Sequence, residues 1–213
     1  MKNLAEFREE KEHLPLVDIG RCGLHVIHGS LKNASKKGTG WELQKLLKAM
    51  WQLLHDAPSR RAIYEIITES LEYPAKFCGH RWVENEDCAS KAVALLAGYR
   101  KFVTHLCGLP KNMQPDNKSL TRLKTMIHDP LLAAKLRFFE MVTGKLNSFL
   151  RAFQTDWPMI PFMADTIGDL VRDFSNRIIL KDVMKKKKSL FDHIQLNPLD
   201  KNIRKPPESV DWV

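Results

Sequence analysis

The chain has 213 residues, of which 34 are Lys or Arg and 25 are Asp or Glu, so its net charge is +9 near neutral pH. Hydrophobic residues make up 44% and charged residues 28%, a balance typical of soluble globular proteins. No apolar run approaches the roughly 20 residues that a membrane span needs, and "MKNLAEFREEKEHLP" at the N-terminus lacks the apolar segment of a signal peptide. We therefore expect no membrane partner.

Helical periodicity dominates the chain. From Trp41 to His55, Leu and Met recur three or four residues apart, which places them on one face of a helix. The apolar run 14–19 and the stretch "YPAKFCGHRW" at 73–82 are expected to be extended, and the Pro-rich tail from Asn197 is expected to be a linker or an open end. The fold class is therefore predicted to be mostly α. The periodicity predicts further helices over residues 60–70, 84–106, 116–128, 131–155 and 160–178.

Four cysteines are scattered along the chain without a disulfide framework, which favours reduced thiols in the nucleus or cytoplasm. Cys22 and His25 are three residues apart and share a helix face, and Cys78 and His80 follow in the extended stretch. Cys and His are natural zinc ligands, so these four residues are one candidate metal site. A Cys22 nucleophile with His25 as its base is a second candidate. Buried thiols and a hydrogen-bonded histidine explain the same residues without either chemistry.

Arg81 and Trp82 lie where the extended stretch meets the next helix. An indole can stack on an unpaired base and a guanidinium can pair with phosphate, so the pair is a candidate DNA contact. A core tryptophan that fixes the helix is the alternative interpretation.

The largest local excess of positive charge follows, near the C-terminus, and includes "KKKK". It favours an acidic partner such as DNA and also fits a nuclear-import patch, although a well-solvated surface is an equally good explanation. The expected localisation is the nucleus, with the cytoplasm as the alternative. The candidate DNA-binding residues are Arg177, Lys181, Lys185, Lys186, Lys187 and Lys188.

Taken together, "DIGRCGLHVIHGSLKN", "DAPSRRAIYEIIT" and "YPAKFCGHRWVENEDCASKAVALLAGYRKFV" resemble the middle part of an hAT-superfamily DNA transposase. The resemblance follows the order of that family's C-x-x-H motif (Cys22, His25) and R-W motif (Arg81, Trp82). It implies a ribonuclease H-like catalytic core, with an Asp-Asp-Glu triad that holds Mg²⁺ or Mn²⁺, interrupted by a large helical insertion domain. The implied division is an N-terminal segment, a remnant of the core with one edge strand, the helical insertion domain and a tail. Their bounds are 1–13, 14–40, 41–196 and 197–213.

No residue of this chain matches the family's three catalytic carboxylates, so no catalytic residue and no metal cofactor carry over from the resemblance. We therefore expect a transposase fragment or derivative that is not an enzyme by itself and that retains non-specific DNA binding. A helical protein-interaction module is the alternative. Either protein could form an oligomer with itself or with a related transposase.

Overall fold

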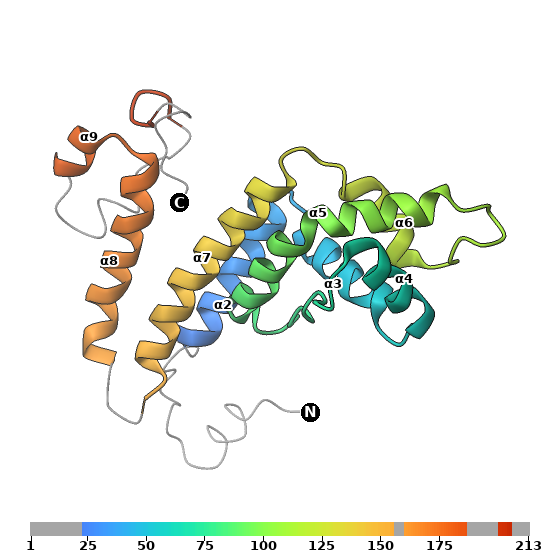
Figure 1. The fold of residues 1–213 in the computed structure, drawn as a ribbon. Coiled ribbons are helices and arrows are strands. Elements are labelled where there is room, and N and C mark those ends of the chain that lie inside the picture. The colour runs from blue at the N-terminus through green and yellow to red at the C-terminus, as the bar shows by residue number, and fades with distance from the viewer. Residues whose placement is uncertain (1–22, 156–159, 187–199, 206–213) are drawn as a thin grey trace, which may run out of the picture.

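The computed structural model describes residues 23–155, 160–186 and 200–205, and within them the chain is almost entirely helical (Figure 1). No β-strand is formed among these residues apart from one isolated bridge, which confirms the mostly α fold class. The predicted edge strand at 14–19 lies outside the described residues. The elements are α2 (Gly23–Asn33), a π-helical turn η1 (Ala34–Gly38), α3 (Leu43–Leu54), α4 (Pro58–Thr68), a 3-10 turn η2 (Trp82–Asn85), α5 (Glu86–Gly108), α6 (Lys118–Met126), α7 (Leu132–Phe153), α8 (Ile160–Ile178) and α9 (Lys181–Lys186).

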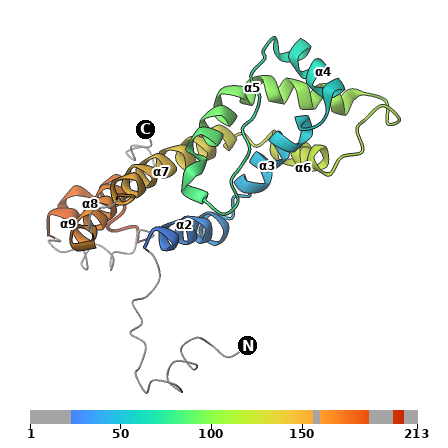
Figure 2. The ribbon, with the colours of Figure 1, turned by 90° about the horizontal axis from the view of Figure 1, so that it is seen from below.

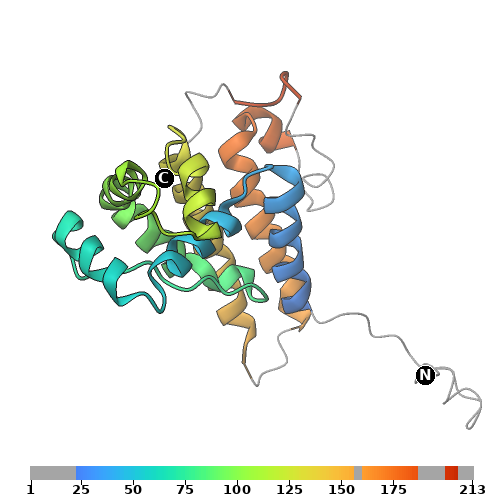
Figure 3. The same ribbon diagram turned by 90° about the vertical axis from the view of Figure 1, so that its right-hand side faces the viewer.

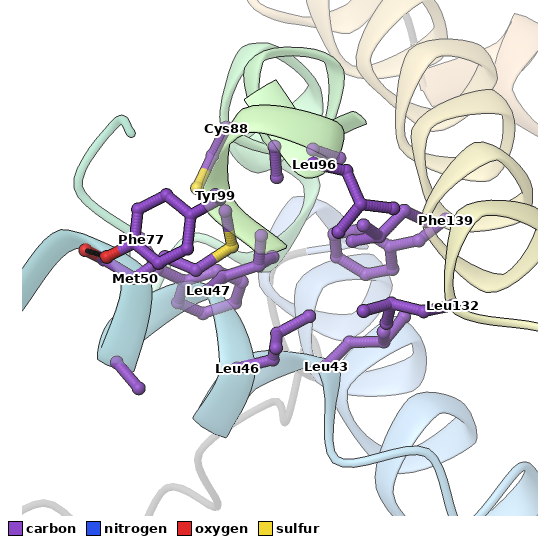
Figure 4. Packing of buried hydrophobic residues seen from close by; sticks show 14 of the residues in the cluster. Leu43, Leu46, Leu47, Met50, Phe77, Cys88, Leu96, Tyr99, Leu132 and Phe139 are labelled. Carbon is purple, nitrogen blue, oxygen red and sulfur yellow. Dashed lines mark hydrogen bonds between the residues drawn. The ribbon is translucent and has the colours of Figure 1, made fainter. Parts of the chain in front are cut away.

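The core forms where α3, α5, α6 and α7 pack together. The leucines of α3 that recur at helical spacing are buried, with Leu46 and Leu47 at 0% and 1% exposure, and they meet α5 and α7 in the interior (Figure 4). Each such leucine contributes roughly 1.5–3 kcal/mol through burial of its apolar surface. Tyr99 of α5 adds a polar tie, because its hydroxyl donates to the Met50 carbonyl of α3 at 2.7 Å. The periodicity that predicts these helices is thus the periodicity of the core.

Helix α2 belongs to the same hydrophobic core as the helices that follow it. Leu31 is 6% exposed and joins the core cluster. Leu24 and Ile27, which precede Leu31 by about two turns and one turn of the helix, pack against that cluster. In Figure 2, α2 runs alongside α7. The segment implied to be a remnant of a lost nuclease core therefore has a packing partner within this chain.

Helices α8 and α9 lie at the end of the molecule away from α4 and α6 (Figures 1 and 3). The Lys145 ammonium of α7 lies 2.8 Å from the Asp173 carboxylate of α8. Residues 200–205 return to the end of α8, where the Leu180 amide donates to the Ile203 carbonyl at 2.8 Å and the Lys205 amide donates to Ile178 at 2.7 Å. The tail is thus attached to the helical body at this one described place.

Residues 70–78 connect α4 to the turn η2 without helix or strand. This agrees with the extended conformation predicted for 73–82, except that Trp82 already starts η2. Among the described residues, no helix combines the length and the hydropathy that crossing a membrane would require.

Candidate nucleic-acid interface

The loop that carries the Arg81-Trp82 pair is held in shape by Asn85, which is 1% exposed. Its Oδ1 accepts from the Cys78 amide at 2.6 Å. Its Nδ2 lies within hydrogen-bond distance of three carbonyls, those of Cys78 at 3.1 Å, Arg81 at 3.0 Å and Trp82 at 3.0 Å. The buried Asn85 side chain thus supplies hydrogen-bond partners to backbone N–H and C=O groups of the turn, which have none in a helix or a sheet.

This turn directs Arg81 and Trp82 to opposite sides. The Arg81 side chain is 60% exposed, and its guanidinium lies 3.3 Å from a carboxylate oxygen of Glu84. Trp82 is 1% exposed, with its ring edge-on to Phe77 at 5.2 Å and to Phe139 at 6.3 Å between centroids. A base cannot stack on the indole in this arrangement. Trp82 therefore has the core position that the sequence analysis gives as its alternative role, and Arg81 alone faces solvent.

Helix α2 reaches the same corner through His28. The Val83 amide of η2 donates to His28 Nδ1 at 3.2 Å, which requires the imidazole to be unprotonated at that nitrogen. Burial is the main cause that lowers the pKa of His28 below its usual value; Glu84 opposes this shift, whereas the positive charges of His25, Arg81 and His80 add to it. The histidines of the C-x-x-H helix and the residues of the R-W turn, distant in sequence, therefore share one electrostatic neighbourhood.

The cysteine residues at this corner differ in chemistry. Cys78 Sγ lies 3.7 Å from His80 Nε2, whereas Cys88 is buried, donates to the Ala75 carbonyl at 3.3 Å and has its pKa raised to about 12 by burial. Cys22 lies outside the described residues, so its pairing with His25 as a zinc ligand or nucleophile stays a prediction. Within the described ranges, no three His, Cys, Asp or Glu residues are grouped so that they could hold a metal ion.

Two lysines that the sequence analysis does not single out lie next to this corner. A Cβ atom placed on Gly79 would be 3.4 Å from the Lys48 ammonium of α3, and the Lys36 ammonium of η1 lies 5.9 Å from the centre of the Trp82 ring. Neither ammonium has a carboxylate within 4.0 Å in the part of the chain that is described. The sequence signal for Lys48 is its place on the polar face of an amphipathic helix, a signal that most surface lysines share.

The candidate DNA-binding residues near the C-terminus differ in their surroundings where the structure describes them. The Arg177 side chain is 21% exposed, lies 3.9 Å from Asp173 and lines an apolar cavity beside Phe174. Lys187 and Lys188 lie outside the described residues. The exposed cations that remain are all in α9: Lys181, Lys185 and Lys186.

No family model, no curated protein and no solved structure matches the chain. The hAT resemblance consequently depends on the order and setting of the two motifs alone.

We expect Asn85→Ala to lower the free energy of unfolding by roughly 2 kcal/mol, because the Cys78 amide and several loop carbonyls lose their partner in a buried place. Urea denaturation followed by circular dichroism measures this. Asn117→Ala is the matched control, since Asn117 caps α6 by accepting from the Ser119 amide at 2.7 Å, and loss of a helix cap costs about 1 kcal/mol. Equal losses in the two variants would contradict the role assigned to Asn85.

We expect His28 to make the fold less stable at acidic pH. Because the folded pKa lies below the unfolded value, the unfolded chain binds more protons there, and stability is lost as pH falls from about 6.5 through the folded pKa. The measurement is the free energy of unfolding between about pH 8 and about pH 5 for the wild type and for His28→Gln, which accepts the Val83 bond without titrating. Parallel pH profiles of the two proteins would exclude this coupling.

Proposed function

We propose that this chain is a helical DNA-binding module related to the middle part of an hAT transposase. In this proposal α2 is the helix that followed the last strand of a ribonuclease H-like core, and α3 to α9 lie in the insertion domain. The order of the C-x-x-H and R-W motifs supports the relationship. The hydrogen bond from the Val83 amide, next to Trp82, to His28 of α2 supports it further, because it joins the segments that carry the two motifs at one corner.

The observation that carries DNA binding is the convergence of cationic groups from three separate segments at this corner. Arg81 comes from the turn before η2, Lys48 from α3 and Lys36 from η1. Lys48 and Lys36 have no carboxylate partner among the described residues, so phosphate oxygens can take that place without breaking an ion pair. The Arg81–Glu84 pair is exposed, and exposed pairs contribute at most about 1 kcal/mol, so phosphate can also compete with Glu84.

The module does not cleave DNA by itself in this proposal. Metal-dependent strand transfer needs carboxylates that hold the ions, and no residue here matches the family's triad. The expected activity is therefore binding without sequence preference, through phosphates, with the exposed lysines of α9 as a second contact. A nuclear location fits such a role.

We expect the logarithm of DNA affinity to fall linearly with the logarithm of salt concentration, and the slope to decrease by about 1 for each phosphate contact removed. Fluorescence anisotropy with a labelled hairpin duplex measures this for Arg81→Gln and Lys48→Gln. Lys101→Gln is the matched control, because Lys101 is exposed on α5, as Arg81 is in its loop, and makes no ion pair within the described part. A variant in which all three α9 lysines become Gln measures the second contact.

A wild-type slope near zero, or equal effects of the control and the corner variants, would contradict phosphate binding at this place. Nicking of a supercoiled plasmid by the purified chain would contradict the absence of cleavage.

One observation favours a protein-interaction module as the second candidate. A cavity of about 370 Å³ opens between α2, α7 and α8, and its walls are mostly aromatic and aliphatic, including Trp41, Phe138 and Phe174. Cavities of this size and composition bind apolar groups. Concentration-dependent self-association in sedimentation equilibrium, without DNA binding at low salt, would favour this candidate over the first.

A further inference from the structure

A tryptophan on the outer face of α3 is flanked by cationic side chains and takes no part in the core. Lys48, Trp51 and His55 follow one another at helical spacing, at the solvent-facing edge of the buried face of α3. Trp51 is partly exposed and is absent from the core cluster and from the side chains that pack against it. Burial of its apolar surface in this fold therefore does not explain the residue.

The ring of Trp51 is held by two neighbours. The His55 imidazole stacks on it with 3.8 Å between ring centroids and 25° between planes, and the Lys76 ammonium lies 5.2 Å from its centroid. Lys76 comes from the extended segment 70–78, which runs back past α3 (Figure 2). We call Lys48, Trp51, His55 and Lys76 the Trp51 platform.

The lysines of the Trp51 platform are available to bind an anion. Neither Lys48 nor Lys76 has a carboxylate within 4.0 Å in the described ranges, and the one acidic contact of the group is His55 with Asp56, at 3.0 Å. Lys48 also lies beside Gly79, one residue before His80 and two before Arg81. The Trp51 platform is therefore continuous with the cationic corner described above.

An indole between cations is chemically suited to an unpaired nucleotide. The flat ring offers stacking to any base, and ammonium groups next to it offer contacts to the flanking phosphates. In a duplex both faces of each base are covered by its neighbours, so a stacking surface selects unpaired strands whereas ammonium groups alone do not. The Lys76 ammonium can leave the ring for a phosphate, because its four-carbon stem rotates freely.

We propose that the Trp51 platform binds single-stranded DNA, with a base stacked on Trp51 and with Lys48 and Lys76 on the adjacent phosphates. This inference depends on the proposed DNA binding and adds to it a site and a preference for unpaired strands. Trp82 supplies no stacking surface, so the preference is assigned to Trp51 alone.

The test compares the affinity of the full chain for an oligothymidylate of about 16 nucleotides with its affinity for a hairpin duplex, by fluorescence anisotropy at one salt concentration. We expect Trp51→Ala to weaken binding to the oligothymidylate by roughly tenfold to a hundredfold, the range that loss of one base stack gives, and to change hairpin binding about twofold or less. Lys76→Gln should lower the salt slope for the oligothymidylate by about 1. Lys101→Gln is the matched control and should change neither affinity.

Circular dichroism and thermal denaturation establish that Trp51→Ala folds, as expected for a side chain outside the core. His55→Ala is the second variant, because it removes the stacked imidazole at an exposed position and should lower the preference for the single strand in the same direction. An unchanged ratio of the two affinities in both variants would overturn the Trp51 platform and leave the proposed function intact. Absence of binding to either probe by the wild type would overturn the proposed function itself.

Discussion

The hydrogen bonds of Asn85 determine how the central corner of this protein is arranged. The turn between the extended segment and α5 contains backbone groups that no regular element pairs, and burial of such groups without partners is costly. The Asn85 amide supplies both a donor and an acceptor to them. With the turn fixed, Trp82 packs against Phe77 and Phe139, Arg81 faces solvent, and the Val83 amide remains available for His28. The hydrogen bond that joins α2 to η2 therefore depends on the Asn85 side-chain amide, which keeps the Val83 backbone in place.

The same arrangement separates the charges of the molecule. Glu86 and Asp87 are in the first turn of α5, where acidic side chains interact favourably with the helix dipole. The Lys48 ammonium of α3, in contrast, is near Gly79 in the loop before η2. Of the three cations assigned to the corner, Lys36 and Lys48 have no carboxylate within 4.0 Å among the described residues, whereas Arg81 is paired with the exposed Glu84.

Helical spacing predicted most of the fold, because the core residues of α3, α5 and α7 are the residues that recur at that spacing. The observed ends differ from the expected ones by a few residues. The role of Asn85 could not be predicted in this way: the letters "VENED" indicate a polar helix start, and nothing in them indicates that one amide turns back to the preceding loop. Trp82 shows a related limit, since an aromatic residue next to an arginine has the same sequence signature in a core as on a binding surface.

Charge patterning selects a different group of cations from the one that the fold brings together at the Arg81 corner. It selected Arg177 together with the lysines that follow, but Arg177 packs beside Phe174 at an apolar cavity. It did not select Lys48 and Lys76, because they are far apart in the sequence and come together only when segment 70–78 runs back past α3. Proximity of this kind depends on tertiary structure, which a count of local charge does not contain.

A stacking surface and a phosphate contact need opposite mechanical properties, and α3 provides both. A ring that stacks on a base must already be fixed, because ordering it upon binding would cost part of the energy gained. Trp51 is fixed because Leu47 and Leu54, on the inner face of the same helix, are 1% and 3% exposed in the core. The lysines, in contrast, have flexible stems that can follow phosphates whose spacing varies along an unpaired strand. The buried face of α3 thus gives the exposed face the rigidity that base stacking requires, and this links the stability of the helical core directly to the proposed binding of single-stranded DNA.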